Sequence, residues 1–379
     1  MLVGLVGWRG MVGSVLLKRM TEENDFSKFE ARFFSSSNAG GEGPQHGSFE
    51  GRPKLYDAYD LCALKECDIL LTCQGSSYTN CVYHKLVSIG WRGYWIDAAK
   101  TLRLHETSVI ALDPINYSFI KKSIDSGIKV FCGGNCTVSC MLMAVGALFT
   151  HNLVDWIFSS TYQAASGGGA NHIKELLAQM GSLYGSSEKL MKDPASKILD
   201  IDRVVLEKQQ QFGGEEIKYF GVPLAGSLIP WIDKDEGSGI SLEEWKGFAE
   251  TNKILGLYEK QSKQIPVDST CVRVGSLRSH CQSLVIKLRK DLPLNEIEKI
   301  IESGNDWVRV VPNNKAESET QLSPVSVSGT LSIPIGRIKK LKLGREYVSA
   351  FTAGDQLLWG AAEPLRRMLN ILIDENCRG

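Results

Sequence analysis

Hydrophobic and polar positions follow one repeating pattern through the first third of the chain. Short apolar runs of the length that forms buried strands occur at 2–6, 31–34, 68–73, 94–96, 109–112 and 128–132. Segments whose apolar residues recur with helical spacing lie between several of these runs, at 11–23, 80–89 and 116–126. Strands that alternate with helices in this way predict an α/β fold with a doubly wound parallel sheet.

The pattern changes after residue 133, where a second, α+β unit with a mixed sheet is predicted. Its expected helices are 137–150, a segment that follows three glycines and runs to about 180, and 294–303. Its expected strands are 153–164, 270–278 and 283–288, with more strand from 308 and from 325. The polar segment 181–214 is expected to cover a surface or a partner subunit.

Residues 355–372 are predicted to form a helix that packs back on the first unit. The expected division of the chain is therefore a first domain at 1–133, a second at 134–354 and a C-terminal helix within 355–379. The second domain is expected to carry both the chemistry and the contact between subunits.

The composition is that of a globular protein without a strong electrostatic field. Apolar residues make up 43% of the chain and charged residues 23%, and 43 basic side chains balance 43 acidic ones. This balance argues against a nucleic-acid or membrane partner and restricts any anion site to a local group of cations. No apolar stretch reaches the roughly 18 residues of a membrane helix. The opening run 2–6 ends in glycines without a basic leader, so it is predicted to be a strand and not a signal peptide.

Ten cysteines are scattered through the sequence, several of them in apolar runs such as 67–73. That distribution is typical of reduced, buried thiols in a cytoplasmic protein. Cys132, Cys136 and Cys140 have a spacing that invites a metal interpretation. They span a strand end and a helix without a histidine pair nearby, so no metal site is predicted.

Gly7, Gly10 and Gly13 stand directly after the first strand and lead into the first helix. Glycines at this spacing let the backbone approach a pyrophosphate at a helix N-terminus, as in the dinucleotide fingerprint of Rossmann-like folds. The alternative is a plain tight turn. An NAD enzyme usually carries an acid after the second strand, whereas this chain has serines at 35–37 and Arg9 in the glycine turn. These groups suit a 2′-phosphate, so NADP is predicted; the alternative for the serines is a solvated turn.

Cys136 follows two glycines and an asparagine and opens the apolar helix. The dipole and free N–H groups of a helix N-terminus favour a thiolate, so the sequence predicts a pKa of about 7 or lower, against about 8.5 for a free thiol. Cys136 is thus a candidate nucleophile, the alternative being an inert buried thiol. Beside a nicotinamide, such a thiol would attack an aldehyde and give an acyl-thioester after hydride transfer.

A base for that chemistry has to come from only six histidines. His280 and Arg273 are separated by an odd number of positions, so on one regular strand they would face opposite sides. A bend or turn is therefore needed to bring both to one site. Periodicity by itself leaves His280 as a satisfied surface or core histidine.

Several segments together resemble one family. They are Gly-Gly-Asn-Cys-Thr at 133–137, Tyr-Gln-Ala-Ala-Ser-Gly at 162–167, Glu-Glu-Trp-Lys at 243–246, the segment with Arg273 and His280, and 354–364. In this order they resemble the aspartate-semialdehyde dehydrogenases of the bacterial kind, over essentially the whole chain. The resemblance implies reduction of L-aspartyl 4-phosphate to L-aspartate 4-semialdehyde by NADPH with release of phosphate, a step in lysine, threonine, methionine and diaminopimelate biosynthesis. It also implies a homodimer that meets through the second domain.

The resemblance assigns roles to individual residues. For catalysis it implies Cys136 as the acyl-thioester nucleophile, His280 as the general acid/base and Gln163 as the group that orients the thiohemiacetal. For binding it implies Glu243 at the substrate amino group, Arg273 at the α-carboxylate, and Arg103, Lys246 and additionally Asn135 at the phosphate. The implied NADP contacts are Arg9, Gly10, Met11, Val12, Ser36, Ser37, Gln74, Ser166, Gly167 and Gln356.

Plainer interpretations exist for the same side chains. Arg103 and Lys246 would otherwise be solvated charges, Glu243 an acid that favours a helix N-terminus, and Gln163 the partner of a buried backbone group. Two features depart from the family pattern. Lys100 stands where relatives usually carry a small hydroxyl residue, and either strengthens phosphate capture or points to solvent. The segment 256–264 is longer and more charged than the usual link and is expected to be an exposed loop.

Two other functions fit much of this pattern. A reductase for N-acetylglutamyl phosphate would share the thiol and the cofactor but should lack an acid placed for a free α-amine, so Glu243 distinguishes it. A non-catalytic NADP-binding redox sensor would use Cys136 as an oxidisable switch without turnover.

Overall fold

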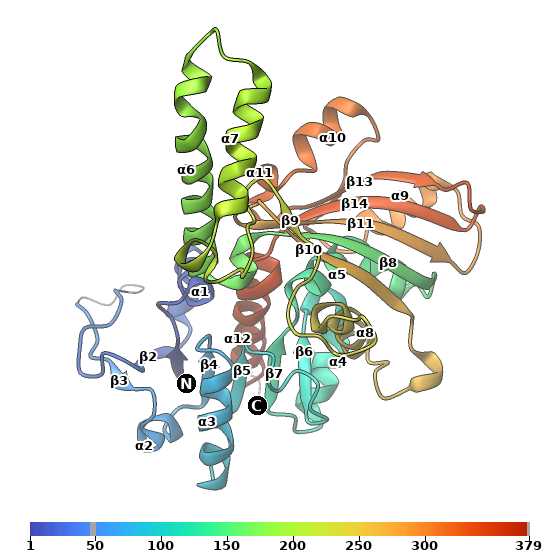
Figure 1. The fold of residues 1–379 in the computed structure, drawn as a ribbon. Helices are drawn as coiled ribbons and strands as arrows, with labels where there is room; N and C mark the ends of the chain where they lie inside the picture. Colours follow the sequence, from blue (N-terminus) through green and yellow to red (C-terminus); the bar gives the residue numbers. More distant parts are fainter. Residues whose placement is uncertain (46–50, 377–379) are drawn as a thin grey trace.

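The computed structural model describes residues 1–45 and 51–376 and contains two sheets connected by a buried helix (Figure 1). The first sheet has the strand order β3-β2-β1-β4-β5-β7-β6, and all neighbouring strands are parallel. Its strands are β1 (Leu2–Val6), β2 (Glu30–Ser35), β3 (Tyr56–Asp57), β4 (Ile69–Thr72), β5 (Tyr94–Asp97), β6 (Ser108–Ala111) and β7 (Val130–Gly133). Its helices are α1 (Met11–Glu22), α2 (Leu61–Lys65), α3 (Ser76–Ser88) and α4 (Asp113–Asp125). The predicted doubly wound parallel sheet is confirmed.

The strand order reverses between β1 and β4, because the chain adds β2 and β3 on one side of β1 and β4 and β5 on the other. Ligands of such sheets bind at the carboxyl ends of the strands beside this reversal. The glycine turn after β1 therefore lies at the edge where a dinucleotide is expected. The sequence did not predict strand β3 or helix α2, because each is too short to show a period of apolar residues.

The second sheet is mixed and has the order β12-β13-β14-β11-β8-β10-β9. Its strands are β8 (Val154–Gln163), β9 (Leu228–Ile229), β10 (Val267–Val274), β11 (Ser279–Leu288), β12 (Val308–Val310), β13 (Ile333–Lys340) and β14 (Tyr347–Asp355). The strand expected from 325 is wrong, since Pro324–Val327 form the short helix α11. Ser323 closes a capping box there and Pro324 takes the first helical turn, so the segment begins as a helix.

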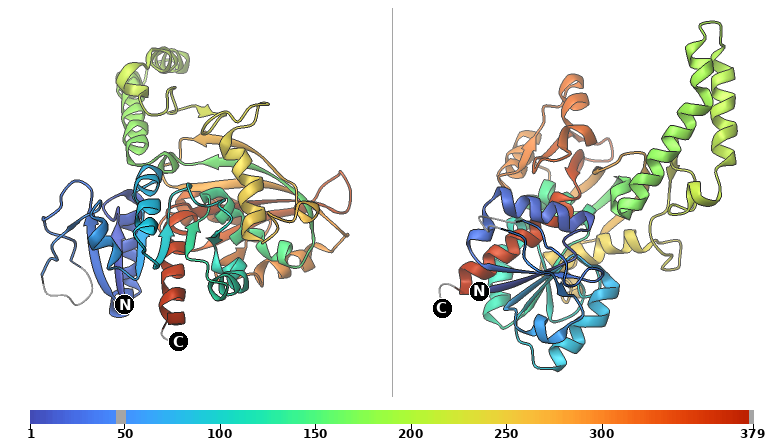
Figure 2. Two further views of the ribbon diagram at one scale, coloured as in Figure 1. Left: turned by 90° about the horizontal axis from the view of Figure 1, so that it is seen from below. Right: turned by 90° about the vertical axis from the view of Figure 1, so that its left-hand side faces the viewer.

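The other helices of this half are α8 (Leu242–Ile254), α9 (Leu294–Glu302) and α10 (Lys315–Gln321), together with the pair α6 (Ala170–Lys192) and α7 (Ile198–Gln211). Helix α6 continues past its predicted end near residue 180 and ends at Lys192. The polar segment 181–214 therefore forms the second half of α6 and the whole of α7. Figures 1 and 2 show this pair rising away from the body of the molecule. Within α7, which lies entirely in the described part of the chain, no residue is buried.

Helix α5 (Cys136–Thr150) follows β7 and precedes β8, so it connects the two sheets. All of its residues except the first and the last are buried. A helix that is apolar on every face must be covered on every face. It is covered by α4 from the first half and by α8, α9, β13 and β14 from the second. Its N-terminal residue, Cys136, consequently lies where the two halves meet.

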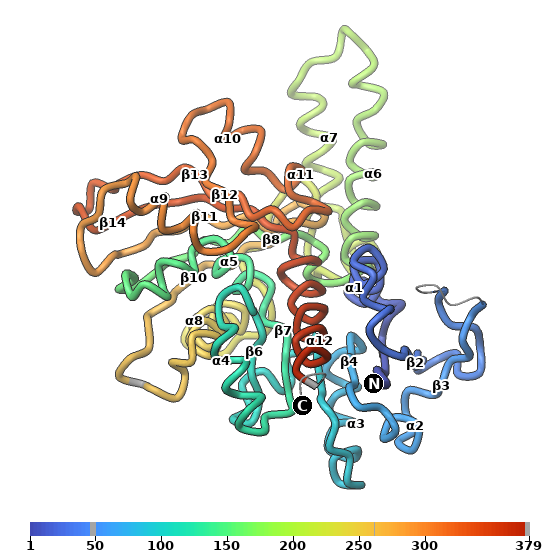
Figure 3. The backbone as a smooth tube through the Cα atoms, turned by 180° about the vertical axis from the view of Figure 1, so that it is seen from behind, coloured from blue at the N-terminus to red at the C-terminus, as the bar shows by residue number. Residues whose placement is uncertain are grey.

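The chain ends its described course with a π-helical turn (Leu358–Ala362) and helix α12 (Glu363–Asn376). The helix begins later than predicted because β14 continues to Asp355. Leu365, Leu369 and Leu372 belong to the same core cluster as Phe33 of the first sheet, and α12 runs beside α1 (Figure 3). In residues 1–45 and 51–376, no helix has the combined length and apolarity that crossing a bilayer would require.

A buried group of charges holds α12 against the first half of the molecule. Replacement of one of these charges therefore tests how strongly the helix is anchored. Arg366 binds Glu363 at 2.9 Å and Asp25 at 2.8 Å, and both carboxylates are almost fully buried. Replacement of Arg366 by Met would leave Asp25 without its closest cation and should lower the free energy of unfolding by about 3 kcal/mol. Urea denaturation measures this. Lys315→Met, which removes an exposed ion pair on α10, is the control and should cost under about 0.5 kcal/mol. A loss below 1 kcal/mol for Arg366→Met would contradict the proposed anchoring.

Candidate active site

A cleft of about 450 Å³ lies at the junction of the two halves and contains most of the chemical groups predicted from the sequence. Its lining includes Val12, Lys100, Arg103, Asn135, Cys136, Gln163, Gly167, Glu243, Lys246, Arg273 and Gln356. These residues come from α1, from the loop after β5, from the start of α5 and from several elements of the second half. The fold thus gathers side chains that are far apart in the sequence.

Cys136 is the first residue of α5 and follows the N-cap Asn135. The Asn135 side chain accepts hydrogen bonds from the N–H groups of Thr137 and Val138 at 3.0 and 3.2 Å. The π-helical turn packs directly on Cys136: a Cβ atom at Gly360 would lie 2.8 Å from the Cβ of Cys136. Turns of this type are frequent at functional sites, and here the turn fixes one wall of the thiol's surroundings.

The lowered thiol pKa expected from the helix N-terminus is not what the surroundings of Cys136 produce. Burial raises the pKa of Cys136 to about 12 and Glu243 adds to the increase, while Arg273, Arg103 and Lys246 act in the opposite direction. Position at a helix end was the only signal visible in the sequence. In the structure, Asn135 occupies N–H groups of the first turn, and the packing around Cys136 removes water that would stabilise a thiolate. The resting group is therefore a thiol.

His280 contacts this thiol. Its Nε2 lies 3.3 Å from the Sγ of Cys136, and its Nδ1 accepts the backbone N–H of Ala164 at 3.0 Å. Because Nδ1 is an acceptor, the neutral ring carries its proton on Nε2, facing the sulfur. Burial, with Arg273 adding to it, lowers the pKa of His280 to about 3. His280 is thus a neutral donor whose Nε2–H faces the sulfur of Cys136.

The bend that the odd spacing required is present. Arg273 is the last residue but one of β10, His280 is the second residue of β11, and the backbone bends between the two strands, at 275 and at 277–278. Both strands pair with β8, which places Gln163 opposite Arg273 in register. Arg273 donates through Nη1 to the carbonyl of Ala164 at 2.7 Å. A Cβ at Gly167 would lie 2.7 Å from that nitrogen, so the glycine leaves room for the guanidinium.

Glu243 is the centre of a second set of contacts. Its Oε1 accepts from Asn135 Nδ2 at 2.9 Å and from Gln163 Nε2 at 3.3 Å, and its Oε2 accepts from Lys246 at 3.0 Å. Burial opposes ionisation of Glu243, but the charge of Lys246 and the amide of Asn135 outweigh it and hold its pKa below the usual value. The cleft therefore contains an ionised acid.

Arg103 is almost buried and pairs with Glu250 at 3.1 Å. Glu250 also accepts the backbone N–H of Asn135, so one carboxylate positions both Arg103 and the residue before Cys136. Sequence reasoning missed Glu250. Its signal was the spacing on α8: Glu243, Lys246 and Glu250 follow each other at three, then four residues and share one helix face.

A second pocket of about 340 Å³ lies at the carboxyl ends of β1, β2 and β4 and is lined by residues of 7–10, 34–37 and 73–74. Gly7 has a φ of 76°, and a Cβ there would meet the backbone of Gln74 at 2.5 Å. Arg9 donates through Nη2 to Ser35 at 3.0 Å and to Ser37 at 2.8 Å, and Gln74 donates to Ser36 at 3.1 Å. This group of a guanidinium and hydroxyls fits a dinucleotide phosphate.

The remaining cofactor candidates lie at the start of α1 or along the cleft. Gly10 caps α1 and Met11 is its first residue, whereas Val12 lines the cleft. Gln356 donates to the hydroxyl of Ser166 at 2.7 Å and lines the cleft too. Ser35 was predicted from the sequence with Ser36 and Ser37 but is not among the contacts that the family resemblance implies; it contacts Arg9 as Ser37 does.

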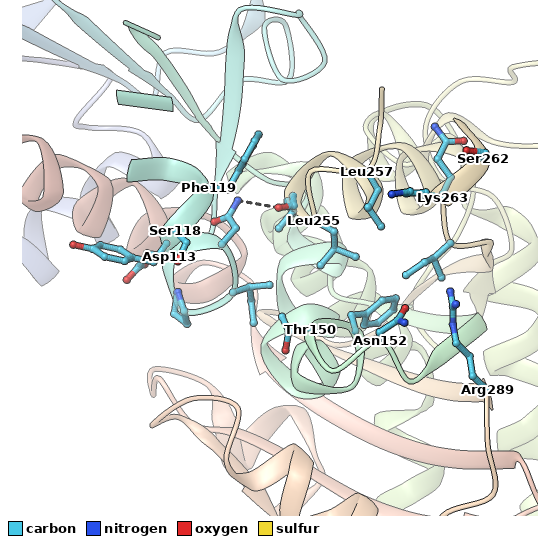
Figure 4. Close-up of a pocket in the computed structure, with 18 residues that line it drawn as sticks. Asp113, Ser118, Phe119, Thr150, Asn152, Leu255, Leu257, Ser262, Lys263 and Arg289 are labelled. Carbon is cyan, nitrogen blue, oxygen red and sulfur yellow. Dashed lines mark hydrogen bonds between the residues drawn. The ribbon is translucent and has the colours of Figure 1, made fainter. Parts of the chain in front are cut away.

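A larger cavity of about 910 Å³ lies elsewhere and contains none of the predicted site residues (Figure 4). It is lined by α4, by the C-terminal ends of α5 and α8, and by residues between 257 and 265. The expectation that 256–264 is simply an exposed loop is therefore wrong in part, because Leu257 is half-buried and helps to form this wall. In the described part of the chain, no group of three His, Cys, Asp or Glu side chains is arranged to hold a metal.

Comparison with known proteins identifies the family. Residues 2–123 match the family model described as semialdehyde dehydrogenase, NAD binding domain, and residues 145–359 match semialdehyde dehydrogenase, dimerisation domain. The structure of aspartate semialdehyde dehydrogenase from Francisella tularensis is 46% identical, with a TM-score of 0.92 over 98% of this chain and 99% of that one. The chain belongs to the aspartate-semialdehyde dehydrogenase family.

More distant structures share the fold of this family. Aspartate semialdehyde dehydrogenase II from Vibrio cholerae, complexed with ASA, is 20% identical with a TM-score of 0.77 over 98% of both chains. The enzyme from Candida albicans, with NADP, is 14% identical with a TM-score of 0.65 over 99% of both chains. These likenesses support the two-sheet architecture.

The raised pKa of Cys136 predicts how the thiol reacts with an alkylating agent. Only the thiolate reacts, so a pKa of about 12 means that the iodoacetamide rate at Cys136 should rise about tenfold per pH unit from pH 7 to 10. Mass analysis of the Cys136 peptide measures this, with the exposed Cys62 as the internal reference. A rate that levels off below pH 8 would instead show a thiolate stabilised at rest.

Proposed function

We propose that this protein reduces L-aspartyl 4-phosphate to L-aspartate 4-semialdehyde with NADPH and releases phosphate, as a step of amino-acid biosynthesis. The observation that carries the proposal is the 3.3 Å contact between the Cys136 thiol and a neutral His280, inside a cleft with separate groups for three substrate charges. Membership of the family supports it.

The substrate presents a carboxylate, an ammonium and an acyl phosphate. Arg273 uses one nitrogen for Ala164, and among the described residues its other nitrogens have no hydrogen-bond partner, so they are available to the α-carboxylate. Glu243, held ionised, suits the ammonium. Arg103 and Lys246 suit the phosphate. Arg103 and Lys246 are already paired with the buried carboxylates of Glu250 and Glu243, so the site tolerates these two charges before substrate arrives.

The first step forms the thioester. The sulfur of Cys136 attacks the acyl carbon, a C–S bond forms and the C–O bond to phosphate breaks. Because the thiolate is the reactive form, the thiol loses its proton as the sulfur attacks, and the departing phosphate takes up that proton. Arg103 and Lys246 stabilise the charge on the departing group. This outcome agrees with a resting thiol and with a His280 that holds its proton.

The second step forms the aldehyde. NADPH supplies the hydride that reduces the thioester carbon. His280 faces this position, and its Nε2–H donates a hydrogen bond that stabilises the hemithioacetal oxyanion. When the oxyanion collapses to the aldehyde the C–S bond breaks, and the departing sulfur takes up one proton that comes from solvent, passed on through His280. Gln163, held by Glu243 and Thr161, orients the oxygen.

We further propose that the protein works as a homodimer through its second half. The matching family model is described as a dimerisation domain. The α6–α7 pair projects from the body, and Ile198 and Leu199 on α7 are 73% and 74% exposed. Apolar side chains gathered on a projecting helix pair are typical of an interface.

A direct assay tests the reaction. Aspartate semialdehyde, NADP and phosphate should give a rise in absorbance at 340 nm that requires phosphate or arsenate. An N-acylated semialdehyde should be a poor substrate, because Glu243 is placed for a free ammonium. Turnover restricted to the N-acylated compound would favour the N-acetylglutamyl phosphate reductase activity, and no turnover would favour a redox sensor.

Cys136→Ala tests covalent catalysis. Loss of the nucleophile should reduce turnover by at least about a thousandfold, the usual contribution of such a group. NADP binding, measured by fluorescence titration, should be unchanged, since the cofactor pocket lies at the carboxyl ends of the first sheet. Residual turnover above one part in a thousand would argue against an acyl-thioester.

Arg9→Ala tests the choice of cofactor. Removal of a charge-assisted contact worth about 1.5–3 kcal/mol should raise the KM for NADP roughly ten- to hundredfold. The KM for NAD should change little, because NAD has no 2′-phosphate. Lys18→Ala, an exposed change on helix α1, which follows the turn with Arg9, is the matched control. An equal effect on both cofactors would show that Arg9 does not read the 2′-phosphate.

A further inference from the structure

Four charged side chains form a continuous row at one end of the cleft. Lys100 lies 3.0 Å from Asp233, Asp233 lies 2.7 Å from Lys246, and Lys246 lies 3.0 Å from Glu243. The signs alternate along the row. Lys100 and Asp233 have no part in the steps above, and Lys100 is the residue that departs from the family pattern.

The two bridged segments belong to different halves of the molecule. Lys100 follows β5, in a loop whose start is fixed by the buried Asp97, which accepts from Thr79 and from the N–H of Ala99. Asp233 lies in the segment between β9 and α8. The pair Lys100–Asp233 therefore connects the two walls of the cleft.

The backbone of Asp233 is held in an uncommon conformation. Its φ is 70°, in the left-handed region that residues other than glycine seldom adopt. Such strain persists only where surrounding contacts impose it, and it is concentrated at functional sites. The contacts here are the two ammonium groups and the Trp231 indole, which donates to the Asp233 carbonyl at 3.1 Å. Although burial acts against it, hydrogen bonds from Lys246 and Lys100 hold the pKa of Asp233 at about 2.

We propose that Asp233 is a resident counter-anion of the phosphate subsite, which the phosphate group displaces, and that Lys100 then serves as a third phosphate-binding cation. The inference rests on the proposed function, because Lys246 is assigned to phosphate there. Asp233 and Lys100 both line the cleft with Arg103 and Lys246. A phosphate dianion carries more charge and more acceptor oxygens than one carboxylate, so it competes effectively for two ammonium groups.

Lys246 and Lys100 differ in how exposed and how tightly held their side chains are, and this difference suits them to different roles in phosphate binding. The Lys246 side chain is only 9% exposed and is also held by Glu243, so it remains in place. The Lys100 side chain is 45% exposed and has Asp233 as its single ion-pair partner in the described part of the chain. Lys100 can therefore follow the incoming anion, and displacement of Asp233 releases the contact between the two walls.

The test measures inorganic phosphate binding by calorimetry, together with the KM for phosphate in the semialdehyde assay. Asp233→Asn removes the competing charge, and asparagine tolerates the left-handed backbone. Phosphate should bind roughly fivefold tighter to this variant, the effect of a partly exposed ion pair. Lys100→Ser should weaken phosphate binding by a similar factor, and the gain from Asp233→Asn should shrink when both changes are combined.

Matched controls lie in the same loop. Asp235→Asn removes one acidic charge and Lys234→Ser removes one basic charge, both at positions outside the row of four. Each variant should bind phosphate within twofold of the affinity of the unchanged protein. Weaker or unchanged phosphate binding in Asp233→Asn, with an unaltered melting temperature, would overturn the proposal and make Asp233 a scaffold for Lys246. Binding is measured without turnover. If the binding changes occurred in a protein without semialdehyde activity, the proposed function would fail while this inference stood.

Discussion

Helix α5 imposes the constraint on which the rest of the structure depends. An apolar surface on every side of a helix has to be covered on every side, and one sheet cannot do this. Helices of both halves and strands of the second sheet surround α5. The residue that opens the helix, Cys136, is then necessarily at the junction, and the cleft beside it takes its walls from both halves.

Burial at this junction determines the electrostatics of the cleft. Every charge placed there loses water, and a buried charge persists only when it is paired and hydrogen-bonded. Arg103 with Glu250, and Lys246 with Glu243, satisfy that condition within the protein itself. The same burial keeps the thiol protonated and His280 neutral. Cys136 and His280 are consequently neutral, and the charged side chains beside them, Arg103 and Lys246, are each paired with a carboxylate.

Periodicity predicted six strands of the first sheet and β8, β10, β11 and β12 of the second, because these buried strands carry their own apolar patterns. It did not locate β13 and β14. It failed at Pro324–Val327, where a capping box decided a helix too short to have a period. The spacing of Arg273 and His280 indicated a bend or turn, and the backbone does bend between them. Contacts between distant segments were invisible: Asp233 beside Lys246 and Gly360 against Cys136 depend on packing. The thiol pKa was predicted in the wrong direction for the same reason, since burial is a property of the whole fold.

The position of α12 has a consequence for synthesis of the protein. This helix contacts β5, β7 and α1, yet it is translated after every strand of the second sheet. Domains usually fold from the N-terminus as they leave the ribosome. Here the half that emerges first keeps part of its apolar sheet face open to water until the last described helix arrives. A nascent chain stalled before Glu363 would expose that face, and cellular quality control would remove such a truncated product.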